Sequence, residues 1–541
     1  MQENPSNRAG AWFDIQVFAQ AFFKKLAGLG GAQRSLRSPR SLLDTPLLWA
    51  LLAAMALLWP LGAGWGLAGA VLLAGVCCVG SVQSLGCVYV FLLMFDNMLP
   101  CPLLGGSAVR VVQLALLGRG VLAHARLRRM SEPYTLRVAV LTLAWCGLSF
   151  ALKGLTADML SFGVNIAALM ALRWLLRVDT CPVGETLHRM LMTYVVGALT
   201  AVALGILYGR IVWLVGDALS GARFMGTHEP NFMAMFLDVA VAIWLFLAPK
   251  GRVRDALVLG VLGGALVFTG SLTGLCMAVL VLGGSLIALR KQGWALAARV
   301  ARALVVAALL AGCAALVLHP PATGGAKDIL GWEASTGVVS GAVPNYLSPE
   351  DYARVRRGEA ALDAVLETEA QMLARREAEG SVPDLEPNRT GDAAERALGR
   401  IPMLGERFTR AYIYLRDNGI DYATSGRLGL MREKAGDYAA LPLWQKLIGR
   451  GPDIEKTYFP LYQTLGYAHC SYLDLLTSLG ALGLAGLLYW IYRVMQRRVF
   501  LGEAMPAPVS AALTAARWAV LLHAATLSMH LNRMFLFFFF G

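Results

Sequence analysis

Charged residues are scarce in this sequence of 541 residues. Asp, Glu, Lys and Arg together make up 15% of it, whereas soluble globular proteins average about 25%. Apolar residues make up 57%, and the mean hydropathy is +0.57. They gather in blocks of about 17–25 residues, which as a helix cross the roughly 30 Å hydrocarbon core of a bilayer. The composition therefore excludes a string of soluble domains and predicts an integral membrane protein.

Cysteine is absent from the longest polar stretch of the chain, residues 319–468. The nine cysteines lie elsewhere, mostly within apolar runs, where a thiol acts as a small apolar group. Disulfide bonds are therefore excluded inside this stretch, even in an oxidising compartment. The stretch is too polar for lipid, so we expect it to form a water-facing domain.

Several catalytic and binding motifs are missing as well. No two of the seven histidines have the spacing of a metal-binding pair, so no metal site is predicted. There is no phosphate-binding loop of nucleotide hydrolases and no glycine-rich dinucleotide fingerprint. Ser271 lacks the Gly-x-Ser-x-Gly context of a serine hydrolase. The halves of the chain show no repeat of the kind common in transporters.

The apolar blocks predict an all-α polytopic membrane protein with about 12–13 membrane-spanning helices. The segments expected to span are 45–60, 64–82, 83–99, 104–122, 136–156, 157–174, 188–208, 231–248, 255–270, 272–290, 300–318, 469–493 and 512–535.

These segments divide the chain into four parts. They are an amphipathic cytoplasmic N-terminal region (1–43), about 11 spans (44–318), a mainly helical extracytoplasmic domain (319–468) and C-terminal spans (469–541). The first part has an apolar face suited to the membrane surface, although a frayed tail fits equally well. Its basic residues precede an apolar block that predicts an uncleaved signal anchor.

Basic residues decide the orientation. Pro320 to Ala468 holds 18 Lys and Arg against 21 Asp and Glu, whereas the whole chain has a net charge of +13. The basic excess therefore belongs to the membrane part, which does not suit a nucleic-acid partner. When the spans alternate, the basic clusters share one side, which predicts that this side is cytoplasmic. The clusters are Arg34/Arg37/Arg40, Arg126/Arg128/Arg129, Arg173/Arg177, Lys250/Arg252/Arg254, Arg290/Lys291 and Arg493/Arg497/Arg498.

The extracytoplasmic domain (319–468) is called the polar domain. Three helices are predicted in it, over 348–379, 391–418 and 425–439. The first begins with Ser348-Pro349-Glu-Asp, which combines a good N-cap, a proline at the first helical position and acids in the first turn.

Two groups of polar residues lie in loops expected on the outer side. One contains Arg223, His228, Glu229 and Asn231, and such groups near lipid need polar partners or a ligand. An ordinary interfacial loop is the alternative. The other, Thr269–Gly274, is a turn between two spans that contains Ser271 and Thr273, and a tight helical hairpin would equally explain it.

Two further groups flank the end of the polar domain. Ser425-Gly426-Arg427 opens the helix that carries Arg432, and arginine presents a fork of donors that matches phosphate oxygens. A solvated helix face is the alternative. His469 stands where the polar domain meets the next span, and a histidine there can act as a general base near neutral pH. The alternative is an interfacial histidine with a structural partner.

Together these groups resemble the O-antigen ligase and O-antigen polymerase superfamily of bacterial envelope enzymes, over about residues 188–493. The family pattern is an Arg with Gly and Pro-Asn before a span, a small polar turn, a Ser-Gly-Arg helix, a Pro…Gly-x-Gly segment and a His that opens a span. The matching residues are Arg223, Gly226, Pro230-Asn231, Ser271-Leu272-Thr273, Ser425-Gly426-Arg427, Pro442…Gly449-Arg450-Gly451 and His469 to Gly486. The chain departs from the pattern at Leu272, where the family has Arg, at Cys470, where Asn or Gln is common, and in the length of the polar domain.

The resemblance implies a GT-C-like fold and an inverting glycosyltransferase that uses neither metal nor cofactor. Its donor would be a glycan on a polyprenyl diphosphate, used at the periplasmic side of the bacterial inner membrane. Arg223 and Arg427 would hold the diphosphate, and His469 would be the catalytic base. The substrate-binding residues would be Asn231, His228, Glu229, Ser271, Thr273 and Arg432.

The resemblance leaves the acceptor open. It is lipid A-core in a ligase, the growing glycan in a polymerase, and a protein hydroxyl in an O-oligosaccharyltransferase. A polysaccharide or lipid transporter, or flippase, is the alternative from another class.

Overall fold

The computed structural model describes most of the chain from Thr45 onwards. The residues outside the description are 1–44, 96–98, 102–105, 128–132, 179–181, 209–210, 214–221, 225, 248–251, 290–292, 318–345, 379–388, 401–404, 418, 424–425, 453–455, 460–463, 529–531 and 541. The predicted amphipathic region 1–43 therefore lies outside the described residues.

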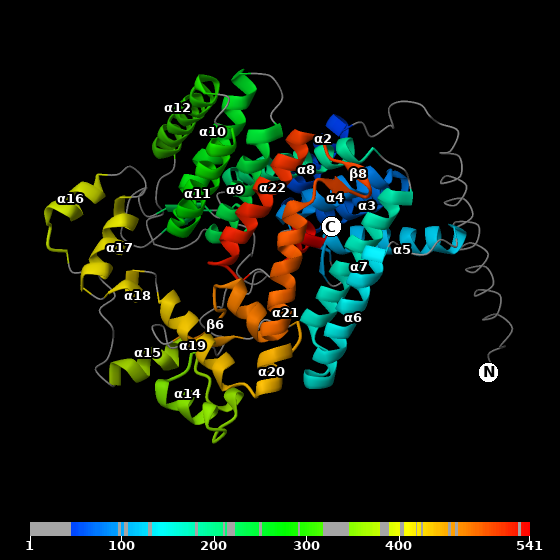
Figure 1. Cartoon of the computed structure of the whole chain (residues 1–541). Helices are drawn as coiled ribbons and strands as arrows, with labels where there is room; N and C mark the ends of the chain where they lie inside the picture. The colour runs from blue at the N-terminus through cyan, green and yellow to red at the C-terminus, as the bar shows by residue number, and fades with distance from the viewer. Residues whose placement is uncertain are drawn as a thin grey trace, which may run out of the picture.

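The first part of the chain is a series of helices (Figure 1). These are α2 (Thr45–Leu58), η1 (Trp59–Leu61), α3 (Ala63–Val79), α4 (Val82–Leu92), η2 (Leu93–Phe95), α5 (Val109–Leu127), α6 (Pro133–Lys153), α7 (Ala157–Val178) and α8 (Val183–Leu207), with the small strands β1 (Pro100–Cys101) and β2 (Gly106–Ser107) between η2 and α5. Then follow β3 (Ile211–Trp213), β4 (Ala222–Phe224), α9 (Pro230–Leu247), α10 (Arg252–Phe268), α11 (Leu272–Ala288) and α12 (Trp294–Val317).

The polar domain and the last helices complete the fold. The polar domain contains α14 (Pro349–Arg356), η6 (Leu362–Ala364), α15 (Glu369–Ala378), α16 (Ala393–Gly399), α17 (Gly405–Asp417), α18 (Ile420–Ala423), α19 (Arg427–Ala440), α20 (Leu443–Ile448), β5 (Thr457–Phe459) and β6 (Thr464–Gly466). After it come α21 (Ser471–Gln496), β7 (Val499–Phe500), β8 (Glu503–Ala504), α22 (Ala507–Ala524) and α23 (Arg533–Phe540). The strands pair consecutively as four two-stranded antiparallel sheets.

The predicted helical architecture is confirmed, and the apolar helices agree with the prediction of a membrane protein. The described residues are mostly helical, and among them α7, α8, α9 and α21 are long and apolar enough to cross a membrane. Shorter apolar helices lie at Pro46–Leu61, Gly64–Cys78, Val82–Phe95 and Leu272–Ala288. A helix occupies every segment expected to span, but the count of 12–13 spans stays a prediction.

Several predicted helices are shorter than expected. The N-cap is confirmed, because Ser348 Oγ accepts the N–H of Asp351 at 3.0 Å, but the helix ends at Arg356. Gly358, at φ 73°, takes the left-handed conformation that ends helices. A new capping pair then opens α15, in which Thr368 Oγ1 accepts the N–H of Gln371 at 3.4 Å and Gln371 Oε1 accepts the N–H of Thr368 at 2.8 Å.

Two further segments that were predicted as single helices each form two helices. The segment predicted as one helix over 391–418 forms α16 and α17, with Pro402 between them, and proline disfavours helical backbone before it. The segment 512–535 also contains two helices, because α22 ends at Ala524 in two turn residues that bond back to its last turn.

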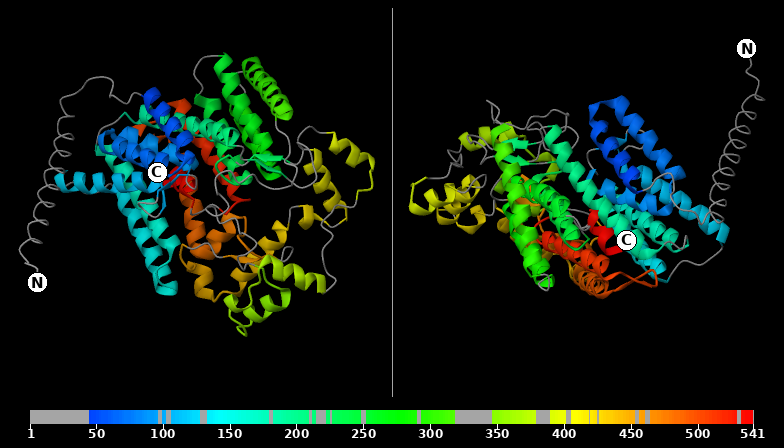
Figure 2. Two further views of the ribbon diagram at one scale, coloured as in Figure 1. Left: turned by 180° about the vertical axis from the view of Figure 1, so that it is seen from behind. Right: turned by 90° about the horizontal axis from the view of Figure 1, so that it is seen from above.

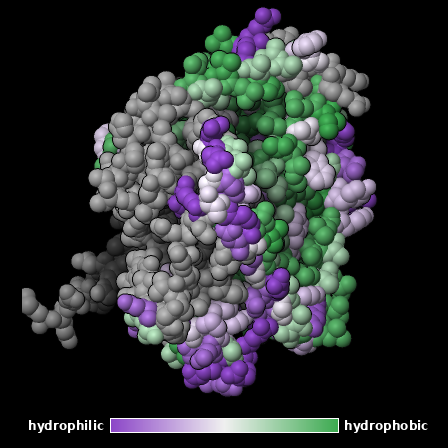
Figure 3. All heavy atoms as spheres, turned by 90° about the vertical axis from the view of Figure 1, so that its left-hand side faces the viewer, coloured by the Kyte–Doolittle hydropathy of each residue, from purple (hydrophilic) through white to green (hydrophobic). Residues whose placement is uncertain are grey.

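The core of the membrane part lies around α9. Nearly all of α9 is buried, and α8, α10, α11 and α22 pack against it. The contact with α11 is close, because a Cβ on Gly274 would lie 2.5 Å from the Cβ of Ala234. Apolar and polar side chains also occupy different parts of the surface. Figure 3 shows hydrophobic residues at the level of α10 to α12 and hydrophilic residues lower down, at the level of α14 to α17.

The described elements of the polar domain gather on one side of the membrane helices (Figures 1 and 2). Their anchor is a backbone contact between the segment after α20 and a kink in α21. Gly480 has φ 68° and ψ 178°, which interrupts the helix and exposes the carbonyl of Ser478. That oxygen accepts the backbone N–H groups of Arg450 at 3.1 Å and Gly451 at 2.9 Å, and the indole N–H of Trp145 at 3.0 Å.

Glycine is required on both sides of this contact. A Cβ on Gly449 would lie 2.1 Å from the carbonyl oxygen of Ser478, and one on Gly480 would lie 2.4 Å from the backbone of Leu447. Both residues also have the positive φ that side chains disfavour. The contact therefore joins the two backbones without side chains between them.

Gly480→Ala should separate this contact and lower the midpoint of thermal unfolding in detergent. We expect a loss of more than about 2 kcal/mol, because the new methyl group meets backbone and the residue is strained. The control is Gly486→Ala in the same helix, where a Cβ would find open space. Its midpoint should stay or rise. Equal midpoints for both variants would disprove the close contact.

Candidate functional site

The first of the predicted site segments enters α9 through a strand and a tight turn. In β4, Arg223 pairs with Val212 of β3, and the side chain of Arg223 lies outside what the structure describes. Gly226 follows at φ 54°, where a Cβ would lie 2.9 Å from the sulfur of Met233. The turn is therefore packed on the first turn of α9.

His228 and Glu229 differ in their exposure to solvent. His228 is buried, its Nδ1 lies 3.0 Å from Thr227 Oγ1, and its ring packs 4.6 Å from the ring of Phe236. Glu229 is exposed, and its carboxylate accepts a hydrogen bond from the side-chain amide of Asn231. The described contacts of His228 are thus internal, whereas Glu229 lies at the surface of the site.

Asn231 joins this segment to the turn between α10 and α11. Its Oδ1 accepts the hydroxyl of Ser271 at 2.7 Å, and both residues are buried. The same hydroxyl caps α11 by accepting the N–H of Gly274 at 3.0 Å. The polar turn therefore has a fixed place against α9.

The polar domain reaches this turn through Arg427. Its Nη1 donates to Thr273 Oγ1 at 3.2 Å, although the two residues are 154 positions apart. The backbone at the start of α19 is well held, because Gly426 takes a left-handed φ of 73° and Asp421 Oδ1 accepts the N–H of Gly429 at 2.8 Å. Asp421 thus fixes the turn that carries the guanidinium group.

His469 lies close enough to Arg427 to feel its charge. Burial, and then the positive charge of Arg427, lower the pKa of the half-buried imidazole from 6.5 to about 4. The backbone of His469 has φ 50°, an uncommon value for a residue with a side chain. Ser471 fixes the chain beyond it, because its N–H and hydroxyl both donate to the carbonyl of Leu527, at 3.0 and 2.6 Å.

These contacts bring most of the predicted residues together. They run from Glu229 through Asn231 and Ser271 to the turn that holds Thr273, and from there to Arg427, whose charge acts on His469. Arg432 is exposed on α19 and stands five positions after Arg427, which turns it to another face of the helix. The described contacts do not connect Arg432 to this cluster.

Sequence reasoning missed a buried polar pair deeper among the helices. Asp238 of α9 and His523 of α22 are both almost fully buried, and Asp238 Oδ2 lies 2.7 Å from His523 Nε2. The pair joins α9, whose second residue is Asn231, to α22, whose end leads to Leu527. An ionisable residue inside an apolar run was the available signal, because such residues are costly in a membrane without a partner.

The cluster has the chemistry of an anion-binding site with a base. The guanidinium of Arg427 is a strong donor for phosphate oxygens. The imidazole of His469 is neutral at pH 7, so it can accept a proton. Within the described residues, no group of three or more His, Cys, Asp or Glu side chains is placed to hold a metal ion.

Comparison with protein-family models, curated proteins and solved structures finds no match for this chain.

The Asp238–His523 pair predicts a specific order of stabilities. Replacing either partner by Leu leaves the other buried without it, which costs roughly 3–5 kcal/mol. The double variant Asp238→Leu/His523→Leu removes both polar groups and should be more stable than at least one single variant. Thermal unfolding of the purified protein in detergent measures the order. Additive losses in the double variant would show that the two side chains do not interact.

Proposed function

We propose that this protein is a glycosyltransferase of the O-antigen ligase type. It moves a glycan from a polyprenyl diphosphate to an acceptor hydroxyl at the periplasmic side of the bacterial inner membrane. The observation that carries the proposal is the position of Arg427. It contacts the turn between α10 and α11 through Thr273, and it lies close enough to His469 to lower the pKa of that residue.

A cation beside an unprotonated imidazole suits the proposed reaction. The leaving group is a diphosphate, which is already charged at neutral pH and needs electrostatic stabilisation more than protonation. Arg427 supplies donors in the geometry that phosphate oxygens accept. The segment of Arg223 would bring a second guanidinium group from the membrane part.

The atoms of the reaction balance without a metal or a cofactor. The acceptor oxygen forms a bond to the anomeric carbon, and the bond from that carbon to the phosphate oxygen breaks. The electron pair leaves with the lipid diphosphate, and the acceptor proton passes to the ring of His469. Direct displacement inverts the configuration at the anomeric carbon. Asn231, Ser271, Thr273 and Glu229 supply hydrogen-bonding groups near the same place.

The membrane helices support a lipid-linked substrate. His469 directly precedes α21, one of the helices able to cross a membrane, and Asn231 stands in the first turn of another, α9. The cluster therefore lies where these two helices begin, and in the proposed function this end would be the level at which the diphosphate of a lipid carrier meets water. The prenyl chain would lie among the apolar helices beneath it.

Purified protein with a lipid-linked glycan and an acceptor tests the proposal. His469→Ala should reduce transfer by at least about 100-fold, which is the lower range for loss of a general base. Arg427→Ala should reduce it by a similar factor through loss of charge stabilisation. The controls are His188→Ala, in the first turns of α8, and Arg354→Ala, on the exposed side of α14.

Full transfer by His469→Ala would disprove the role of His469 as the general base. No transfer by the wild-type protein to any of the three acceptors would disprove the proposed function.

Lipids from a deletion strain identify the acceptor. Accumulated lipid-linked polymer means a ligase, and accumulated single repeats mean a polymerase. Lipid movement across the membrane without transfer would instead establish a transporter.

The low pKa of His469 predicts an unusual dependence of transfer on pH. The free imidazole stays neutral down to about pH 4, so kcat/KM should not fall through pH 6.5, where an ordinary histidine becomes protonated. The acidic limb should lie near the pKa of about 4. Samples returned to pH 7 should regain full activity, which separates protonation from unfolding. A reversible acidic limb at pH 6.5 would contradict the low pKa.

A further inference from the structure

The short helix α20 of the polar domain exposes its apolar residues and covers its polar ones. It has six residues, and none of them is buried. Leu443 is 73% exposed, and three more large apolar residues of this helix are between 40% and 45% exposed. The two polar residues between them, Gln445 and Lys446, are half-buried. The exposed set is called the apolar face of α20 and consists of Leu443, Trp444, Leu447 and Ile448.

This arrangement is the reverse of the usual one for a helix in a water-facing domain. Residues three and four positions apart share one side of a helix, so the four members of the apolar face lie together. Helices on the surface of soluble domains turn such a side toward the core and leave the polar side in water. A group of large apolar side chains left outside indicates a contact with a partner or a membrane.

The place of α20 is fixed by its neighbours. Gly449, which follows the helix, meets the kink of α21, and a Cβ on Gly451 would lie 2.2 Å from the Cβ of Ser149 in α6. On the other side, the hydroxyl of Tyr438 donates to the carbonyl of Lys446 at 2.9 Å. Figure 1 shows α20 beside α21. The helix is therefore held between the polar domain and the membrane helices, with its apolar face outward.

The same contacts set the depth of α20. Ser149 stands four residues before the end of α6 at Lys153, which is about 6 Å along that helix. Gly480 stands nine residues after the start of α21 at Ser471, which is about 14 Å. The headgroup layer on each side of the hydrocarbon core is roughly 5–8 Å thick. With α6 and α21 spanning as expected, α20 lies near the level at which headgroups meet acyl chains.

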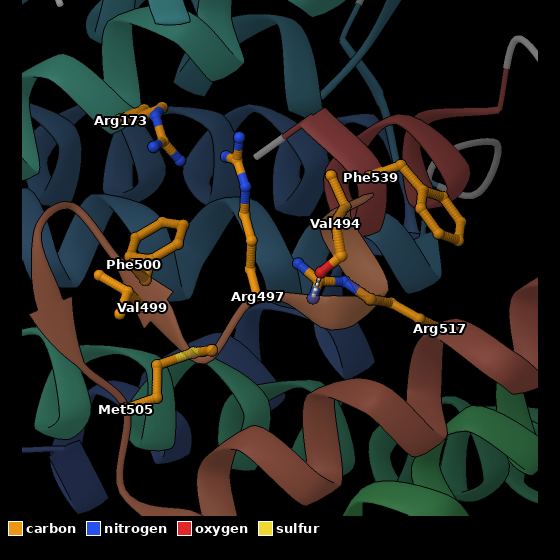
Figure 4. A pocket seen from close by; sticks show the side chains of 8 residues that line it. All are labelled: Arg173, Val494, Arg497, Val499, Phe500, Met505, Arg517 and Phe539. Atoms are coloured by element: carbon orange, nitrogen blue, oxygen red, sulfur yellow. Dashed lines mark hydrogen bonds between the residues drawn. The ribbon is translucent and has the colours of Figure 1, made fainter. Parts of the chain in front are cut away.

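Exposed apolar side chains also surround this contact on the two long helices. Phe150, next to Ser149, is 59% exposed, and Leu482, two residues after Gly480, is 62% exposed. The far end of α21 is instead held by α22, because Arg517 donates from Nη1 to the carbonyl of Val494 at 3.3 Å (Figure 4). The apolar face of α20 thus belongs to a region where α6 and α21 are open to lipid.

We propose that the apolar face of α20 binds the lipid bilayer, at the boundary between headgroups and acyl chains of the leaflet on which the polar domain lies. Tryptophan is enriched at this boundary, because its ring is apolar and its N–H can meet water, and Trp444 supplies it here. Helices that bind membranes in this way bury an apolar side about 5–10 Å into the boundary. The polar domain is then attached to lipid as well as to α21.

A second copy of the chain is the competing partner. A stable interface between two proteins buries about 1,200 Å² or more, which a face of four side chains does not supply by itself. Lipid is favoured because the exposed apolar residues continue onto helices that are expected to span the membrane. The inference concerns contact with lipid and does not depend on the proposed transfer reaction.

Photo-crosslinking of the full-length protein in phospholipid nanodiscs tests this inference. A benzophenone amino acid in place of Leu443 bonds on irradiation to the nearest C–H group. Mass spectrometry should find the protein with the added mass of one phospholipid, in about tenfold higher yield than in the control, because a residue in water rarely meets acyl chains. The control carries the same amino acid in place of Leu362, an exposed leucine of η6. Figure 1 shows the preceding helix, α14, at an edge of the polar domain far from α9 to α12.

The same replacement of Trp444 is the second variant, which keeps the test open if the change at Leu443 disturbs folding. It should also give a phospholipid adduct. Doubled protein mass at both positions, without phospholipid adducts, would overturn the lipid in favour of a second copy of the chain. Absence of any adduct at Leu443 and Trp444, or an equal yield of phospholipid adduct at Leu362, would overturn the membrane contact.

Discussion

The contact between the Gly449–Gly451 segment and the kink of α21 is the constraint on which the candidate site depends. A kinked helix exposes a carbonyl that an unbroken helix would use itself, and the polar domain supplies the missing donors. Because the two backbones meet directly, the domain has little freedom to slide along α21. This contact sets the position of α20, and through α19 it sets the position of Arg427. The position of the polar domain over the membrane helices is therefore determined by contacts between backbone atoms.

A second set of contacts positions the other half of the cluster. The Asp238–His523 pair holds α9 against α22, and the loop after α22 holds Ser471 beside His469. Asn231 and His469 consequently belong to one framework, although they stand on different helices. Arg427 enters this framework from the polar domain. The membrane side of the cluster is thus held by contacts between helices.

The sequence is informative wherever a feature is local. Blocks of apolar residues predict the positions of α9 and α21, and Ser348 with Pro349 predicts the start of α14. Features that depend on partners far away in the sequence cannot be predicted in this way. No local pattern shows that Arg427 meets Thr273, 154 residues earlier, or that Asp238 meets His523, 285 residues later. The resemblance to the O-antigen ligase superfamily named most residues of the cluster, but it gave neither the backbone contact nor the inner pair.

The bond from Ser471 to Leu527 has a consequence for the biosynthesis of the protein. His469 leaves the ribosome long before Leu527 does, so a nascent chain can insert α21 while the neighbouring histidine still lacks its support. Asp238 likewise lacks its partner His523 until α22 has been inserted, and until then it contacts lipid or other helices. The site is thus completed only after α22 and Leu527 have been translated. A chain interrupted earlier would occupy the membrane without a finished site.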